Sequence, residues 1–299
     1  MSEAIILEQG VKVAQPVAAG HSLQAMAWRQ LWRKRTALVG IGIIVVLVLT
    51  AMLADVLAPY DPTATGSGVP MSEPNWQHPL GTDMLGRDML SLVIHGSRVA
   101  IYVGVLSLLL PIVVGIPLGV ISGFYGGAID NVIMRLMDIM LAFPIFLLAI
   151  VVMVILEPST TNVVIALGIV RIPIYARIVR GSVLSIKALT YIEAAKALAV
   201  RDLRLLWGHI LPNCMAPIIV TSTLNVGTSI IAEASLSFLG LGTQPPTPSW
   251  GWDLKAGLMT LEINPWICLF PGVAIFLTVL AFNLFGDGLR DALDPRLKM

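Results

Sequence analysis

The feature that most constrains this chain is a series of apolar runs, each about 20 residues long or more. A bilayer core is about 30 Å thick, and a helix of about 20 apolar residues crosses it. Six windows are predicted to be membrane spans, at 36–58, 99–124, 132–156, 163–179, 214–241 and 263–285. The composition agrees, because 57% of the residues are hydrophobic and only 12% are charged, unlike an ordinary soluble domain. The sequence therefore predicts an all-α polytopic membrane protein with about six transmembrane helices.

The fourth window is the weakest, because it contains Arg171, Pro173 and Arg177. Lysine and arginine gather on the cytoplasmic side of inserted helices, and this tendency supports the span. Without it, the basic residues between Lys187 and Arg204 would lie outside the cell. We therefore predict six spans with both termini cytoplasmic. The chain then divides into a cytoplasmic N-terminal segment at 1–35 and a transmembrane domain at 36–299, with outward segments at 59–98 and 242–262.

One polar stretch, YIEAAKALAVRDLRLLWGHILPN at residues 191–213, interrupts these apolar runs. On a single helix its apolar residues form one narrow stripe opposite the charged ones: Ile192, Ala195, Ala199, Leu203, Leu206 and Ile210. Pro212 is predicted to mark the entry into the next span. Two interpretations remain open. The stretch is either a basic amphipathic helix on anionic lipid, or a docking surface for another protein, which Glu193 and the two alanines after it would contact closely.

The letters EAAKALA, followed ten residues later by HILP, resemble the EAA loop of the membrane subunits of ABC importers. The family pattern is EAA, three residues, Gly, nine residues, then I-x-L-P. Five positions match it: Glu193, Ala194, Ala195, Leu211 and Pro212. His209 stands at the isoleucine position, which the peptide-transport branch often fills with histidine, and Ala199 replaces the glycine. Because glycine permits a left-handed turn, Ala199 implies either a helix that continues through this point or a modest strain.

Four further segments resemble dipeptide, oligopeptide and nickel permeases: YDP at 60–62, HPLGTDMLGRDMLS at 78–91, SFLGLGTQPPTPSWG at 237–251 and FNLFGDGLRDALDP at 282–295. Together they cover most of the chain from Pro59 to the end. The resemblance implies the transmembrane domain of a type I ABC importer, in a bacterial plasma (inner) membrane. It also implies that residues 36–299 form the permease domain and that residues 185–212 form its coupling loop.

In such importers the EAA helix is seated in a cleft of a cytoplasmic ATPase. The resemblance assigns this coupling role to Glu193, Ala194, Ala195, Ala199, Leu211 and Pro212. It implies as partners two cytoplasmic ABC ATPase subunits, a second homologous permease and an extracytoplasmic substrate-binding protein, besides membrane lipid. The sequence itself contains no GxxxxGK[ST] phosphate loop and no Gly-Lys pair. We therefore expect no enzyme activity and no cofactor in this chain, with ATP hydrolysed by the partners, and the charge balance suggests no nucleic-acid partner.

Polar residues inside the spans are candidates for the translocation path. An ionisable group at the bilayer centre costs about 2.5 to 3.5 kcal/mol on insertion scales, so it should face a path or a partner. Arg171 and Glu233 qualify, and each either meets the substrate, forms a structural ion pair or snorkels to an interface. Asn225 and Asn283 are expected to join helices by hydrogen bonds, and Asn225 is also a candidate for the path.

Several smaller motifs have structural interpretations. Asp83 and Asp88 have no accompanying nucleophile or metal-ligand set, so we expect them to cap turns and a short helix. Tryptophans 250, 252 and 266 fit an interfacial belt. The segment GDGLRDALDP is interpreted as a turn followed by an amphipathic cytoplasmic helix, or as a solvated tail. Prolines and glycines within the second span indicate a bent helix packed closely on its neighbours, or ordinary tolerance of such residues in membranes.

Two other classes of protein are alternatives to an ATP-driven importer. An intramembrane protease would need a GxSG or HExxH motif in a span, and GVISG at 119–123 is one residue too long. An ATP-independent secondary carrier could use Arg171 and Glu233 to couple ion and solute movement. However, no internal repeat is evident, and a long basic cytoplasmic loop has no necessary role in a carrier. The expected cargo of the importer is a peptide or a related small solute.

Overall fold

The computed structural model describes residues 31–32 and 34–293, and this part of the chain is helical and contains no strand. The N-terminal segment at 1–35 lies almost wholly outside the described residues, as do Asp294 and Pro295 at the end of the last motif. The elements are α2 (Arg35–Met52), α3 (Ala54–Leu57), α4 (Met89–Leu106), η1 (Pro111–Gly115), α5 (Ile116–Tyr125), α6 (Gly127–Leu141), α7 (Ile145–Leu156), α8 (Thr160–Lys187), α9 (Thr190–Ala197), α10 (Asp202–Leu205), η2 (Leu206–Ile210), α11 (Leu211–Phe238), α12 (Trp250–Met259) and α13 (Trp266–Leu293).

Five of the resulting helical segments are long and apolar enough to cross a membrane, and a sixth crossing is possible where two helices join at a bend. The fourth window is confirmed as a helix of this kind, because α8 continues through Arg171 and Pro173. The window at 132–156 is not one straight helix. It falls on α6 and α7, which meet at 87° near Pro144, where proline cannot donate the backbone hydrogen bond that would continue the first helix.

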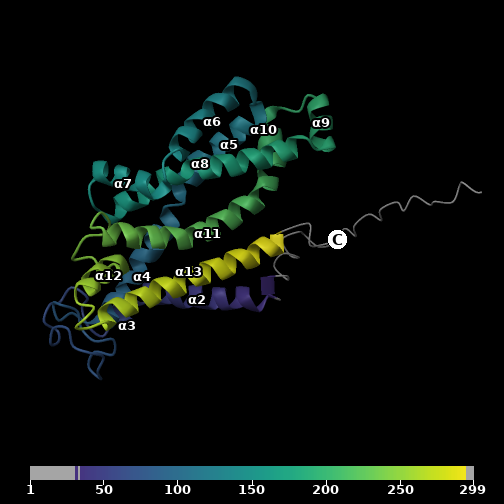
Figure 1. Ribbon diagram of the computed structural model, residues 1–299. Coiled ribbons are helices and arrows are strands. Elements are labelled where there is room, and N and C mark those ends of the chain that lie inside the picture. The colour runs from purple at the N-terminus through teal and green to yellow at the C-terminus, as the bar shows by residue number, and fades with distance from the viewer. Residues whose placement is uncertain (1–30, 33, 294–299) are drawn as a thin grey trace, which may run out of the picture.

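The helices are layered, as Figure 1 shows from top to bottom: α6, then α5 with α8, then α11 with α4, then α13 and α2. α2 lies along α13, α13 packs on α11, and α11 in turn packs on α8. α5 packs on α8 so closely that a Cβ at Gly119 would come within 2.4 Å of the carbonyl oxygen of Ala176. The close packing expected for the second span is therefore confirmed. This span contains a π-helical turn, η1, that begins at Pro111.

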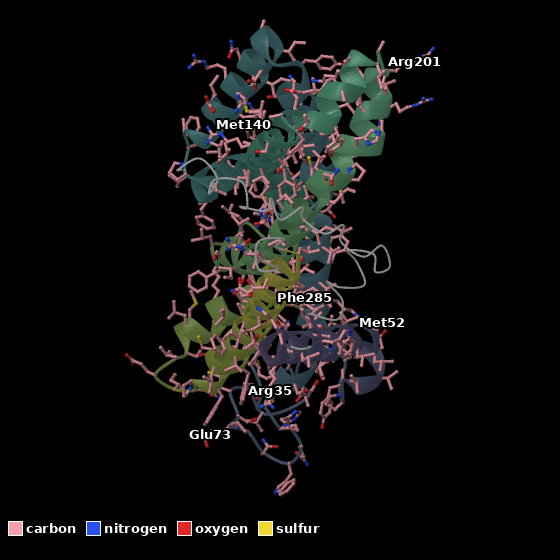
Figure 2. The ribbon with its side chains drawn as sticks, turned by 90° about the vertical axis from the view of Figure 1, so that its right-hand side faces the viewer. Arg35, Met52, Glu73, Met140, Arg201 and Phe285 are labelled. Carbon is pink, nitrogen blue, oxygen red and sulfur yellow. The ribbon has the colours of Figure 1, made fainter. Side chains whose placement is uncertain are left out.

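The two ends of the molecule are built differently, and we name them for later use. The loop end consists of residues 58–88 and 239–265, and the α9 end of residues 188–210. Figure 1 shows the first, with α3 and α12, at the lower left, and α9 at the opposite extreme. In Figure 2, which looks from the α9 side, Arg201 lies near the upper edge of the molecule and Glu73 near the lower edge.

The loop end is organised by buried carboxylates. Asp88 caps α4 by accepting a hydrogen bond from the backbone N–H of Ser91 at 2.8 Å, and its other oxygen lies 3.0 Å from Nδ1 of His78. Asp83 accepts hydrogen bonds from the backbone N–H groups of Leu85 and Arg87 and from Nε of Arg87 at 2.7 Å. The predicted capping role of both aspartates is thus confirmed. Because α4 begins at Met89, the second span starts as a helix ten residues before the predicted Val99.

Two further expectations are wrong. Trp250 is buried, with its indole N–H donating to the carbonyl oxygen of Val93 at 2.9 Å, so it is a packing residue rather than a member of an interfacial belt. The sequence GDGLRDAL forms no turn, because α13 continues unbroken to Leu293. Its glycines lie within the helix and allow α13 to pack closely on α2: a Cβ at Gly288 would lie 2.5 Å from Cβ of Ala37.

Candidate functional site

The polar stretch at 191–213 folds as two helical pieces rather than as one helix. α9 ends at Ala197, and Ala199 follows with φ of +53°, in the left-handed region. The backbone N–H of Val200 donates to the carbonyl oxygen of Ala195 at 3.2 Å, and that of Ala199 to Lys196 at 2.9 Å. This is the Schellman arrangement that ends many helices, with Ala199 at the position where glycine is usual. Of the two alternatives for Ala199, the structure adopts the strained turn, and the single continuous stripe is wrong.

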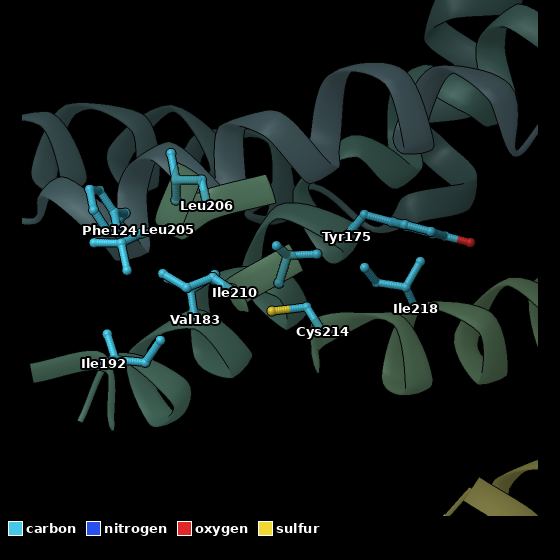
Figure 3. Close-up of a cluster of buried hydrophobic side chains, with 10 residues drawn as sticks. Phe124, Tyr175, Val183, Ile192, Leu205, Leu206, Ile210, Cys214 and Ile218 are labelled. Atoms are coloured by element: carbon cyan, nitrogen blue, oxygen red, sulfur yellow. The ribbon is translucent and has the colours of Figure 1, made fainter. Parts of the chain in front are cut away.

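The turn divides the predicted stripe into buried and exposed members. Ile192, Leu206 and Ile210 are buried, whereas Leu203 is 69% exposed and Ala199 is also exposed. The buried members join one apolar cluster with residues of α5, α8 and α11, which Figure 3 shows extending from Ile192 past Val183 and Cys214 to Ile218. α9 is therefore attached to the spans by apolar contacts on one side. Phe124, at the end of α5, is part of the same cluster, and Nζ of Lys196 lies 5.2 Å from its ring centroid.

The opposite side of this segment is uncovered. Glu193 and Ala194 are exposed, and the side chain of Glu193 has no hydrogen bond or ion pair in the described part of the chain. Leu198 is 80% exposed and Trp207 69%. Leu211 and Pro212 begin α11, which continues directly from α10 and η2 as one helical segment, Asp202–Phe238. The helix of this span therefore begins ten residues before Pro212, and the prediction that Pro212 marks its entry is wrong. The exposed face combines a carboxylate, small residues and large apolar side chains.

Arg171 lies at a second site, about midway along α8, with its side chain buried. Its Nη1 donates to the hydroxyl oxygens of Ser229 and Ser107, the latter at 3.3 Å, and its Nη2 donates to Oγ1 of Thr228 at 3.0 Å. Three elements therefore meet here: α8, α11 and the junction between α4 and η1. No carboxylate of the described residues pairs with Arg171. The expected structural ion pair is absent from this part of the chain.

Asn225 continues this polar contact between α8 and α11 by one turn. Its Nδ2 lies 3.4 Å from the hydroxyl of Tyr175, which donates to Oγ of Ser222 at 2.9 Å. The prediction that Asn225 joins helices is confirmed. The hydroxyl partners of Arg171 were not predicted from the sequence. Their signal is their spacing, since Thr228 and Ser229 follow Asn225 by three and four residues and so lie near it on one side of α11.

Glu233 lies apart from Arg171, and the two do not pair. Its Oε1 accepts hydrogen bonds from the hydroxyls of Ser237 at 2.7 Å and of Thr243 and Ser249 at 3.0 Å each. Two of these donors belong to residues 239–249, so the carboxylate ties that segment to the end of α11. This arrangement is structural in character.

Asp253, on α12, is a buried carboxylate that sequence reasoning missed. In the described part of the chain, its Oδ2 is the one buried side-chain oxygen or nitrogen with no hydrogen-bond partner. Burial raises the pKa of Asp253 to about 7, and the nearby guanidinium of Arg87 only partly offsets this effect. A polar residue on a short helix outside the spans gave no signal in the sequence. No group of His, Cys, Asp or Glu side chains suited to a metal ion occurs among the described residues.

Comparison with known proteins gives a consistent result over most of the chain. Residues 115–299 match the family model described as binding-protein-dependent transport system inner membrane component. Residues 22–75 match the N-terminal transmembrane domain of oligopeptide transport permease C. A glutathione transport system permease protein of Pectobacterium atrosepticum is 45% identical over 276 residues, which are 91% of this chain and 92% of the relative. Dipeptide transport system permease proteins of Alkalihalophilus pseudofirmus and Haemophilus influenzae are 44% and 43% identical, over 91% of this chain and 90% and 94% of their own lengths.

Proposed function

Because the chain belongs to the binding-protein-dependent transport system inner membrane component family and is a permease subunit of an ABC importer, we propose that it moves peptides or glutathione-like solutes inward and is driven through α9. The relatives are named for dipeptides and glutathione, which share peptide-type bonds and free carboxylates. An ATP-independent carrier is not favoured, because the relatives are all subunits of transport systems.

We further propose the complex in which this permease works. It pairs with a second homologous permease, and two cytoplasmic ATPase subunits hydrolyse the ATP. An extracytoplasmic binding protein delivers the solute to the loop end. Both termini are cytoplasmic, which places the α9 end on the same side as the ATPases.

The observation that carries the coupling role is the two-sided character of α9. One side is fixed to three spans through Ile192 and its buried cluster, while Glu193, Ala194 and Leu198 face outward. A segment that is held rigidly to the spans and exposes an uncovered face can transmit movement of a bound subunit to the membrane helices. In this proposal Glu193 and Ala194 contact the ATPase, and Ala195 supports them by packing on the buried cluster. Ala199 sets the turn, and Leu211 and Pro212 lie in the helical segment that moves.

The test is ATP-driven uptake by the complete importer carrying Glu193→Arg. We expect uptake to be lost, because the reversed charge and longer side chain prevent seating of the ATPase, while membrane insertion is unchanged. Glu157→Arg is the matched control, since Glu157 is an exposed glutamate between α7 and α8, outside both the loop end and the α9 end, and its uptake should equal that of the wild type. Normal uptake by Glu193→Arg would remove Glu193 from the coupling role.

The path through the spans is proposed to include Arg171, Asn225 and Glu233. Arg171 and Asn225 line one polar contact between α8 and α11, and this contact supports their assignment. Glu233 has the weaker support, because its Oε1 already accepts three hydrogen bonds from hydroxyl groups.

A further inference from the structure

Two arginines in the described part of the chain have buried side chains, and their surroundings differ. Arg87, at the loop end, has a carboxylate partner, Asp83, at 2.7 Å. Arg171 has hydroxyl partners only. A buried cation is normally paired with an anion, since hydroxyl groups supply hydrogen bonds but no compensating charge. Arg171 therefore lacks a counter-charge among the described residues.

The position of Arg171 makes this imbalance informative. It is 11 residues from the start of α8 at Thr160 and 16 from the end at Lys187, or about 17 Å and 24 Å along the helix axis. The side chain is therefore too far inside the span to reach either interface easily, so snorkelling to water or to lipid headgroups does not explain it. A cation held this deep in a span normally faces a pathway or an interior partner.

One edge of the guanidinium is free to bind a ligand. Nη1 donates to two serine hydroxyls and Nη2 to Thr228, but Nε donates no hydrogen bond. Nε is not among the buried unpaired atoms of the described residues, so it is not sealed from its surroundings. Thr228, beside Nη2, is exposed. The edge formed by Nε and Nη2 therefore lies beside an exposed residue, and such an edge can hold a carboxylate through two parallel N–H donors.

Neutral polar groups continue from this edge along the same pair of helices. Asn225, Tyr175 and Ser222 are linked by hydrogen bonds about one turn farther along α11, and both Asn225 and Ser222 are partly exposed. Amide and hydroxyl groups of this kind can pair with the backbone amides of a short peptide. The site therefore offers a cationic edge with neutral donors and acceptors beside it.

We propose that the Nε and Nη2 edge of Arg171 binds a carboxylate of the solute as it crosses the membrane, and so favours anionic or zwitterionic peptides over cations. This inference rests on the proposed function, because it takes its solute class from there. Ser107 and Ser229 position the guanidinium by accepting from Nη1. Thr228 accepts from one of the two N–H groups of Nη2, which leaves the other for the ligand. Arg171 is thus a specificity-determining residue within the path.

The test uses the complete importer in proteoliposomes at saturating binding protein, with radiolabelled glutathione and radiolabelled dialanine as separate probes. Four forms are compared: wild type, Arg171→Lys, Arg171→Gln and Arg171→Glu. We expect the uptake of both probes to fall as the charge at position 171 changes from positive to neutral to negative. Losing a charge-assisted hydrogen-bonded pair should lower uptake by about tenfold or more in Arg171→Gln, with Arg171→Glu lower still and Arg171→Lys between Gln and wild type. Arg177→Gln, an exposed position on the same helix, is the matched control and should keep wild-type uptake.

The Glu variant separates a binding role from a packing role. A glutamate can accept hydrogen bonds from the same three hydroxyl groups that Arg171 now contacts. If Arg171 only holds α8 to α11, Arg171→Glu should transport as well as Arg171→Gln, and that result would overturn the inference while leaving the proposed function intact. If the wild type imports neither probe, the proposed solute class fails and the inference fails with it.

A carboxylate on the second permease is the remaining alternative ligand. In that case Arg171→Gln and Arg171→Glu would lose the second permease on purification, whereas Arg171→Lys would retain it, and the inference would be wrong. If none of the variants assembles, electron microscopy of the wild-type importer prepared with glutathione decides. A carboxylate of glutathione within about 3 Å of Nε supports the inference, and an empty edge or one filled by a protein side chain overturns it.

Discussion

The two ends of the molecule satisfy their polar groups in opposite ways. At the loop end, Asp83 pairs with Arg87 and Asp88 with His78. The loop-end hydroxyls of Thr243 and Ser249 donate to Glu233 on α11, and all these groups are buried. At the α9 end, the buried residues are apolar and the polar ones face outward. Apart from Asp253, the loop end pairs its buried carboxylates within its own chain, whereas the α9 end is fixed on one side and uncovered on the other. This difference agrees with the proposal that the ATPase docks on the α9 end.

The largest expected effect is at the loop end, with Asp83→Asn. The change leaves the guanidinium of Arg87 buried without its counter-charge, and breaking such a pair costs about 3–5 kcal/mol of folding stability. Thermal unfolding of the detergent-purified protein measures it. Asp61→Asn is the control, because Asp61 is exposed, and its unfolding temperature should stay at the wild-type value. Equal unfolding temperatures for the two variants would contradict the description of the loop end as pairing its buried carboxylates within its own chain.

Ile192→Ala tests the attachment of α9. Removing a buried isoleucine side chain typically costs about 2–5 kcal/mol, and here it would loosen α9 from α5, α8 and η2. We expect a lower unfolding temperature together with weaker retention of the ATPase subunits. Leu198→Ala, at an exposed position, should weaken that retention without changing the unfolding temperature. If both variants behaved alike, the buried and exposed sides of α9 would not differ as proposed.

The loop end should also make the folding stability of the protein depend on pH. Because the pKa of Asp253 is raised to about 7, the folded state keeps a proton that the unfolded chain releases above its ordinary value of 3.8. Stability should therefore fall as the pH rises from about 4 to about 7 and then level off. Asp253→Asn should remove this part of the slope and raise the unfolding temperature more at pH 8 than at pH 5. An unchanged slope would show that Asp253 is not buried without a partner.

The smallest expected effect is a gain in folding stability, from Ala199→Gly. Ala199 has a left-handed conformation that a glycine adopts without the steric cost of a Cβ atom. Ala199→Gly should therefore stabilise the turn after α9 by about 1 kcal/mol. Part of this gain is offset because glycine has more conformational entropy in the unfolded chain. The unfolding temperature of the purified protein measures the change. A loss of stability would indicate that the turn at Ala199 is not the conformation the chain adopts.

The sequence predicted the fold well where a single principle dominated. The lengths of the apolar runs located the apolar helices. The positive-inside tendency supported the prediction of a span at α8, although α8 contains Arg171 and Pro173. The predictions failed where tertiary contacts override local pattern. Trp250 is buried because it meets Gly96 and Val93, far from it in sequence, and the end of α13 stays helical because Gly288 packs on Ala37.

The candidate sites show the same division. The motif located α9, but periodicity alone could not show that the helix ends before Ala199, because alanine is a good helix former and only the left-handed turn excludes a continued helix. Arg171 was identified because placing a charged side chain in a membrane span costs free energy. Ser107, Thr228 and Ser229 were not identified, because a hydroxyl group in a span costs far less. Asp253 was not predicted because its burial arises only where α12 packs on α4, α11 and α13.

The most direct test of the coupling role is photo-crosslinking from position 198 in the complete importer, with a photoreactive amino acid in place of the exposed Leu198. The same substitution at Trp76, an exposed residue of the loop end, is the control. We predict a crosslink from position 198 to a co-purified nucleotide-binding subunit, identified by mass spectrometry, and none from position 76. A crosslink from position 198 to lipid alone would contradict the account, because α9 would then be a membrane-surface helix.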